Sequence, residues 1–340
     1  MQKKYEGIVY AVNLYGHRQL YVNTLSAVTG FTYVTGRPTI ELFLTLSRRK
    51  GSIVFITIED TFYFYLLCGI TRSMFGRKTV GMQFEHLKNQ KKTLGRHLLK
   101  YLIRKALNKL RPLSTISIIP HEAFPLQRES SKASIHDPAF WDLTVNSRYE
   151  NPDWGDVEAN NIKRVCEEHE TNILSLGTIT ERKGFEYFVD LMVMVRAKGL
   201  RVGFVAAGMV HHQMSEDLLD KFEGLGGVLI DRYLTESEVL YLQSKMDVFW
   251  ACYPKHFDQS SGIAGRAFQL EKKVIVRKGS VIDGVLSSLR YNSIIVECSE
   301  KGLDALMTDL FCEKDRSQIE KLKTPYDLYS ESVQILREYL

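Results

Sequence analysis

The sequence contains few cysteines, and none of them is arranged to bind a metal or to build a disulfide framework. Five single cysteines are spread over 340 residues, and no CxxC pair occurs. Isolated cysteines argue against a structural zinc site or a disulfide scaffold and favour a reducing compartment. No apolar run is long enough to span a membrane, and the first residues lack a signal-peptide pattern. We therefore expect a cytoplasmic protein.

The chain has no large overall excess of either charge, but its charge is unevenly distributed. The composition, 44% hydrophobic and 25% charged, is typical of globular proteins, and 340 residues suffice for two domains. Residues 1–150 contain 22 Lys and Arg against 10 Asp and Glu, which gives +12, whereas the remainder has 23 against 30, which gives −7. This asymmetry predicts an anionic partner for the first half.

A short polar turn between two expected strands is the most informative motif. Strands expected at 246–251 and 273–277 flank the turn 259–262 (Gln-Ser-Ser-Gly), which opens a helix. A helix N-terminus binds phosphate through its free N–H groups and positive dipole end, and small residues let a diphosphate reach the backbone. The alternative is an ordinary N-cap, because serine is favoured at that position in any helix.

A second loop places two cations next to an expected strand end. Residues 173–177 read as a buried strand, and the following loop, 178–184, contains Arg182 and Lys183 before a helical pattern begins at Phe185. Two adjacent cations suit a diphosphate, although an Arg-Lys pair in a loop is often only solvated. In an αβ series both loops lie at the carboxyl ends of strands, where open sheets bind ligands.

Five landmarks in order make residues 172–284 resemble the nucleotide-sugar-binding domain of GT-B glycosyltransferases, nearest the retaining enzymes of family 4. The landmarks are the strand ending at Gly177 with its loop to Lys183-Gly184, a strand ending in glycine at 202–208, a strand, loop and acidic helix at 228–239, a strand beginning Met246-Asp247-Val248, and the donor-site motif at 258–266. No single landmark is specific, but their order over about a hundred residues is.

The resemblance implies an α/β GT-B fold with two Rossmann-like domains facing a cleft. In the first half, short apolar strands are expected at 7–12, 52–58, 79–84 and 115–119, as in a parallel sheet buried on both faces. We expect an N-terminal acceptor-binding domain at 1–150, a nucleotide-sugar-binding domain at 151–325, and a final helix at 326–340 that crosses back to the first domain. The polar stretch 122–170 is expected to connect the domains, with Asp137-Pro138 near the crossing.

The same resemblance implies transfer of a sugar from a nucleotide diphosphate sugar to a glycan or lipid-linked acceptor, with retention, in surface polysaccharide synthesis. Arg182 and Lys183 would neutralise the diphosphate, and the backbone of the 259–262 turn would cradle it. No cofactor or metal is expected, because cations and helix dipoles replace the metal and no Asp-X-Asp triplet occurs. The expected donor set is Arg182, Lys183, Arg232, Gln259, Ser260, Ser261, Gly262 and Arg266.

The chain departs from the family pattern, which has two glutamates eight positions apart in the donor motif. Asp258 occupies the first position, keeps the carboxylate and is expected to face the sugar hydroxyls, whereas Arg266 reverses the charge at the second. An arginine cannot accept hydrogen bonds from ribose hydroxyls, so Arg266 is expected to face a phosphate. Thr178 stands where the family usually has an arginine, which Arg182 is expected to replace. These departures leave a non-catalytic GT-B scaffold as an alternative.

The first half offers candidates for the acceptor side and for catalysis. Gly16-His17-Arg18 follows the first expected strand, where the glycine permits close backbone approach and the side chains suit a sugar or phosphate; a solvated turn is the alternative. The histidine that family members place near the transferred sugar corresponds loosely to His86, for which a structural role is the alternative. His86 and Asp258 are therefore the expected catalytic residues.

The segment 88–111 contains nine Lys and Arg and no acidic residue. Leu98, Leu102, Ala106 and Leu110 fall on one helical stripe, so we expect a basic amphipathic helix. Such a helix either docks on an anionic membrane, which makes the protein peripheral on the inner face, or only packs on the sheet. The charge also raises a nucleic-acid-modifying glucosyltransferase as an alternative, but Tyr101 is the only aromatic residue in the run, which argues against nucleic acid.

Overall fold

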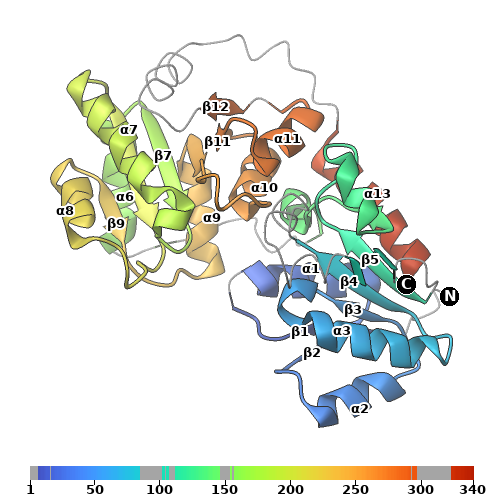
Figure 1. Ribbon diagram of the computed structural model, residues 1–340. Helices are drawn as coiled ribbons and strands as arrows, with labels where there is room; N and C mark the ends of the chain where they lie inside the picture. Colours follow the sequence, from blue (N-terminus) through green and yellow to red (C-terminus); the bar gives the residue numbers. More distant parts are fainter. Residues whose placement is uncertain are drawn as a thin grey trace. The chain divides into compact units, whose positions relative to one another are not determined.

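The computed structural model describes residues 7–15, 17–84, 102–103, 105–106, 112–145, 154, 157–291, 293–296 and 323–340. The chain divides into two compact units, Met1–Asn146 with Lys323–Leu340, and Ser147–Leu322. In the described residues each unit contains a six-stranded sheet whose recorded strand pairs are all parallel, with helices around it (Figure 1). The expected α/β class is confirmed.

The sheet of the first unit has the order β2-β1-β3-β4-β5-β6. Its strands are β1 (Ile8–Ala11), β2 (Thr32–Thr35), β3 (Ile53–Phe55), β4 (Thr79–Gln83), β5 (Leu113–Ser117) and β6 (Ala133–Ser134). The helices and 3₁₀ turns described in this unit are α1 (His17–Thr29), α2 (Ile40–Arg48), α3 (Ile58–Ser73), η1 (Pro125–Glu129), η2 (Pro138–Phe140), η3 (Asp142–Thr144) and α13 (Pro325–Tyr339).

Alternation along the strands buries both faces of this sheet. Val9 and Ala11 belong to a core cluster with Leu25 of α1 and Leu336 of α13, while Ile8 and Tyr10 belong to a second cluster with residues of α2 and α3. Successive side chains of a strand point to opposite faces. Helices α1 and α13 therefore cover one face, and α2 and α3 cover the other.

Residues Asp137 and Pro138 lie inside the first unit and not in a connection between units. Asp137 is buried, and its Oδ1 accepts hydrogen bonds from the Tyr21 hydroxyl at 2.8 Å and from the backbone N–H of Ala139 at 2.9 Å. Pro125 and Pro138 belong to the stretch that the sequence predicts as an irregular connection, but each begins a 3₁₀ turn. Proline is tolerated at a first helical position because no N–H is needed there. Trp141 is fully buried beside them.

Histidine 136 makes the first unit sensitive to acid. His136 is 6% exposed, and burial, with a smaller contribution from Lys323, lowers its pKa from 6.5 to about 3. The neutral form is thus the folded form, so its contribution to stability is complete above pH 6.5 and is lost as pH falls. We expect the free energy of unfolding to fall by about 2–3 kcal/mol between pH 6.5 and 4.5 because of this residue. Denaturant titrations of the wild type and of His136→Gln would test this; parallel pH profiles would contradict it.

The sheet of the second unit has the order β12-β11-β10-β7-β8-β9. Its strands are β7 (Thr171–Leu176), β8 (Val202–Ala207), β9 (Val228–Ile230), β10 (Val248–Ala251), β11 (Lys273–Arg277) and β12 (Ile294–Val296). Its described helices are α6 (Val157–Glu168), η5 (Glu181–Lys183), α7 (Phe185–Ala197), α8 (Glu216–Gly224), α9 (Glu236–Lys245), α10 (Gly262–Gln269) and α11 (Val281–Ser288).

The core of the second unit fixes the strands that carry the two sequence motifs. Phe188 of α7 packs against Phe204 of β8 and Trp250 of β10, with ring centroids 5.3 and 5.4 Å apart. The strands expected at 173–177, 246–251 and 273–277 are confirmed as β7, β10 and β11. Among the helices that the structure describes, none is both long and apolar enough to cross a bilayer.

Candidate functional site

Three loops leave the carboxyl ends of β7, β10 and β11, which are neighbours in the second sheet. The first two loops approach each other at Gly184. Its φ is +71°, and a Cβ on it would lie 2.2 Å from the carbonyl oxygen of Cys252, at the start of the second loop. Only glycine fits such a left-handed position against a backbone atom. The expected convergence of both loops at one sheet edge is therefore observed within this unit.

Lysine 183 points from the first loop to the second. Its Nζ lies 4.6 Å from the centre of the Tyr253 ring and 3.5 Å from the Tyr253 hydroxyl. That hydroxyl lies 2.9 Å from Oγ of Ser261, the N-cap of α10, whose side chain accepts from the backbone N–H of Ala264. An ammonium, a phenol and a capped helix start thus lie in one row, a combination suited to an anion.

Arginine 182, on the first loop, lies over an aromatic ring of the second loop. Its guanidinium carbon is 4.5 Å from the centre of the Phe257 ring, and Phe257 in turn packs on Tyr253 at 5.7 Å. Arg182 is exposed and Lys183 is half-buried. This cation–π contact holds the guanidinium, whose N–H donors lie in its own plane and remain able to reach a ligand.

Aspartate 258 is held by a buried arginine at the end of β11. Oδ1 of Asp258 is 3.2 Å from Arg277 Nη2 and accepts the backbone N–H of Val281 at 2.8 Å. Arg277 is 6% exposed and also donates from Nε to the Tyr253 carbonyl at 2.8 Å. This one side chain therefore fixes both the carboxylate and the loop that carries Tyr253.

The remaining residues of the motif lie at the start of α10 or within it. Gln259, Ser260 and Gly262 are half-buried in the turn before the helix and at its first residue, and Arg266 is 7% exposed inside α10. Arg266 is therefore buried in the helix, where a charged side chain is costly unless its donors are hydrogen-bonded.

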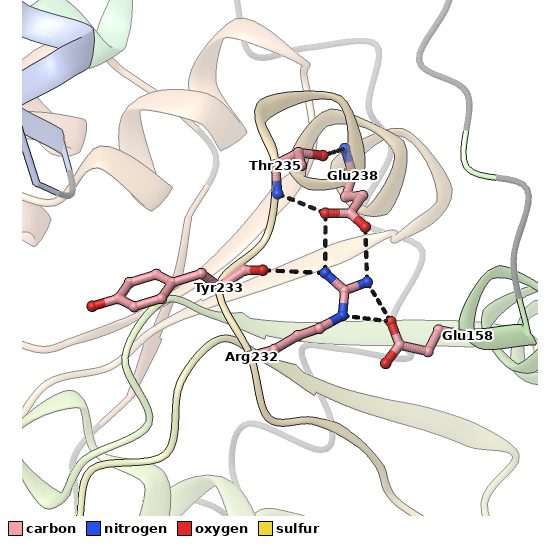
Figure 2. Close-up of polar contacts among 5 residues, drawn as sticks. All are labelled: Glu158, Arg232, Tyr233, Thr235 and Glu238. Carbon is pink, nitrogen blue, oxygen red and sulfur yellow. Dashed lines mark hydrogen bonds and ion pairs between the residues drawn. The ribbon is translucent and has the colours of Figure 1, made fainter.

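Arginine 232 lies between two carboxylates (Figure 2). It donates to Glu158 Oε2 at 3.0 Å through Nε, and to Glu238 Oε1 at 2.8 Å and Oε2 at 3.2 Å. Glu238 completes a capping box with Thr235 at the start of α9. The hydrogen bonds from Arg232 lower the pKa of Glu238 from 4.5 to about 2, and those of Glu238 and Glu158 raise the pKa of Arg232.

Replacing Glu238 by glutamine should weaken the second unit at neutral pH. Because Arg232 is 36% exposed, solvent screening limits the loss, and we expect about 1–2 kcal/mol in the free energy of unfolding. The contribution is complete above pH 4.5 and disappears as pH falls towards 2, so the variant and the wild type should converge in acid. Glu216→Gln, in the first turn of α8, controls for the helix dipole. An equal loss in both variants would contradict the ion-pair explanation.

The candidates of the first half are only partly described. Gly16 and His86 lie outside the described residues, as does most of 88–111. His17 is the first residue of α1, but its side chain lies outside the described part. Arg18 donates to Asn13 Oδ1 at 2.8 Å and pairs with Asp60 of α3. The structure thus joins the loop after β1 to the start of α3 at the carboxyl edge of the first sheet.

Three residues of the site were not foreseen from the sequence. The rings of Tyr253 and Phe257 contact Lys183 and Arg182, respectively. Arg277 forms an ion pair with Asp258. Tyr253 and Phe257 stand near the Ser-Ser-Gly turn, and their aromatic character is the signal that was available. Arg277 reads as the end of an apolar strand, so only its charge in a buried strand could have indicated it.

No family model matches the chain, and no curated protein matches it. Solved structures do resemble it. The structure of Anabaena HepE in complex with UDP and glucose superposes with a TM-score of 0.64 at 10% identity, and the match covers 98% of this chain and 98% of that one. A UDP-forming trehalose-phosphate synthase from Burkholderia xenovorans has a TM-score of 0.57 at 9% identity, covering 98% of this chain and 95% of that one.

Staphylococcus aureus MnaA bound to UDP gives a TM-score of 0.60 at 10% identity, covering 98% of this chain and 96% of that one. A Listeria monocytogenes protein assigned as a UDP-N-acetylglucosamine 2-epimerase gives 0.57 at 11%, with 98% and 95% covered. These likenesses extend over nearly the whole chain, and they show that it has the GT-B fold with two Rossmann-like units. At such low identity, fold is what they establish.

Proposed function

We propose that this protein transfers a sugar from a nucleotide diphosphate sugar to an acceptor. The observation that carries this is the row formed by Lys183, Tyr253 and Ser261 at the start of α10, with Arg182 beside it. Cations and a helix N-terminus can neutralise a diphosphate leaving group without a metal. Neighbours of the same fold that contain UDP, such as HepE and MnaA, support this assignment.

The proposed roles follow from position. Arg182 and Lys183 neutralise the diphosphate, and the turn formed by Gln259, Ser260, Ser261 and Gly262 presents backbone N–H groups to it. Asp258, fixed by Arg277, faces the sugar hydroxyls. Arg266 and Arg232 complete the donor set. Since Arg232 already bridges two carboxylates, we expect it to add less affinity than Lys183.

The finer assignment is that of a retaining, metal-independent hexosyltransferase nearest family 4, with His86 beside the transferred sugar and 16–18 on the acceptor side. In this proposal residues 1–150 bind the acceptor, 151–325 bind the nucleotide sugar, and 326–340 form a helix returning to the first domain. The acceptor is a glycan or a lipid-linked saccharide, in surface polysaccharide synthesis. A basic helix at 88–111 would hold a cytoplasmic protein on the inner face of an anionic membrane.

A nucleotide-sugar screen tests this function. Thermal shift with uridine, guanosine, adenosine and cytidine diphosphate sugars should show one preferred base, and that donor should release nucleoside diphosphate when acceptor is added. Binding without any turnover, across all acceptors, would favour the non-catalytic scaffold. Conversion of the free nucleotide sugar into an epimer, with no diphosphate released, would assign the site to epimerisation. Binding of random DNA at physiological salt would instead support the nucleic-acid alternative.

A further inference from the structure

Helix α3 exposes a continuous apolar stripe. Tyr63, Leu67, Ile70 and Met74 are 55, 52, 42 and 80% exposed, and Phe75, which follows the helix, is 65% exposed. Their spacing of four, three and four residues places Tyr63, Leu67 and Ile70 on one face of the helix, and Met74, its C-cap residue, continues that line. The opposite face, which includes Tyr65 and Cys68, packs into the core. A surface helix that is apolar on its outer face as well as on its core-facing side indicates a partner for the outer face.

Helix α2 extends this surface. It packs beside α3 on the same face of the sheet and exposes Ile40 and Leu44. Arg77 links the ends of the two helices, because its guanidinium lies 5.2 Å from the centre of the Phe75 ring and donates to the Ser47 carbonyl at 2.8 Å. The apolar stripe therefore continues directly into the basic end of α2.

A pocket of about 730 Å³ opens at that end. Arg48, Arg49 and Lys50 contribute three exposed cations to it, and the described lining residues include no acid. No salt bridge is recorded for these three cations within the part of the chain that the structure describes. Thr32, Thr45 and Ser52 add hydroxyl groups to the lining, and the Ser52 hydroxyl donates to the Leu340 carbonyl at 2.7 Å. The lining residues are Gly7, Ile8, Gly30, Thr32, Thr45, Arg48, Arg49, Lys50, Gly51 and Ser52.

A buried arginine fixes the shape of this pocket. Arg72 of α3 has no exposed surface and donates to the carbonyls of Leu46 at 2.9 Å and Arg49 at 2.7 Å, and also to that of Gly51. The loop that carries the three cations is therefore held before any ligand binds, which lowers the entropic cost of binding.

The charge around the stripe is mainly positive. Residues 42–58 and 61–84 contain no Asp or Glu, whereas Glu41, beside Ile40 in the first turn of α2, is exposed. The two acids between them are engaged at the other end of α3, where Glu59 accepts from the Phe84 N–H at 2.8 Å and Asp60 pairs with Arg18. An apolar stripe with a cationic rim and a cationic pocket suits a bilayer with anionic headgroups. A second copy of the chain fits less well, because like charges would face each other.

We propose that the outer face of α2 and α3, with the pocket of Arg48, Arg49 and Lys50, docks on an anionic phospholipid bilayer. The apolar side chains enter the interface, and the pocket takes phosphate groups of the lipids. None of the residues named for this surface belongs to segment 88–111, and the proposal does not depend on the sugar-transfer assignment.

Vesicle co-sedimentation of the full chain tests this docking surface. Vesicles of phosphatidylcholine alone are compared with vesicles that also contain phosphatidylglycerol. We expect binding to the mixed vesicles, a loss of about 100-fold in the partition coefficient for R48Q/R49Q/K50Q, and a loss of at least about tenfold for M74S/F75S. The control K198Q/K221Q/K245Q removes three exposed cations from the second unit and should bind like the wild type.

Every altered side chain is exposed, so each variant should retain the far-ultraviolet circular dichroism and thermal midpoint of the wild type. The proposal is overturned if the wild-type protein does not co-sediment with the mixed vesicles. It is also overturned if R48Q/R49Q/K50Q and M74S/F75S both bind like the wild type. Membrane contact would then belong to another surface, and segment 88–111 would be the first to test. A dimer in analytical ultracentrifugation that M74S/F75S dissociates, without vesicle binding, identifies a second copy as the occupant instead.

Discussion

Replacing Gly184 by alanine should strongly destabilise the second unit. The added Cβ would lie 2.2 Å from the carbonyl oxygen of Cys252, at a φ of +71°. Left-handed strain and a clash with a backbone atom act together, and we expect a loss of about 4 kcal/mol or more in the free energy of unfolding. Urea titration followed by circular dichroism measures this loss.

Gly199 is the matched control for that substitution. Its φ is +66°, nearly the same, and nothing lies within 4 Å of a Cβ built on it. Gly199→Ala should therefore show only the conformational strain, about 1–2 kcal/mol. Equal losses in the two variants would show that the loops can separate, and that their close approach at Gly184 is not a fixed feature of the site.

The carboxyl edge of the second sheet could be predicted because its signals are local. Strand, glycine, cation pair and helix follow one another within a dozen residues, and the Ser-rich turn caps α10 through Ser261 as its sequence predicts. Each of these features depends on backbone geometry that neighbouring residues determine.

Contacts between distant residues were not predictable in the same way. Arg277 reaches Asp258 and the Tyr253 carbonyl only because β10 and β11 are adjacent in the sheet. Arg232 meets Glu158 across 74 positions of sequence. A charge in a loop looks the same in the sequence whether it is solvated or bridged, so its partners follow from the topology alone.

The first unit was harder to predict, because its strands are short and its helices begin early. The strand expected at 52–58 ends at Phe55, and Ile58 already begins α3. β-Branched and aromatic residues continue through the loop and into the helix, so the apolar run contains no sign of the boundary. Strand β2 was not among the expected strands, because its residues are largely exposed and form no buried apolar run.

Lysine 183 should contribute a large part of the affinity for a nucleoside diphosphate. Its ammonium is positioned by the Tyr253 ring at 4.6 Å and lies beside the capped start of α10. A charge-assisted contact to phosphate contributes about 1.5–3 kcal/mol, so Lys183→Ala should weaken binding about 10- to 150-fold. Isothermal titration calorimetry with the preferred diphosphate measures the difference, and Tyr253→Phe should show a smaller loss because the ring remains.

The control for Lys183→Ala is Lys198→Ala, which removes an exposed cation at the opposite end of α7. Both variants lose one positive charge, so a general electrostatic effect would weaken binding equally in both. We expect wild-type affinity for Lys198→Ala, since its charge is a helix length away from the loop. If Lys183→Ala also binds with wild-type affinity, the diphosphate does not lie against the 178–184 loop, and the donor assignment of Arg182 and Lys183 is wrong. The fold would stand in that case, because Lys183 is only half-buried and its removal leaves Gly184 and the core of α7 in place.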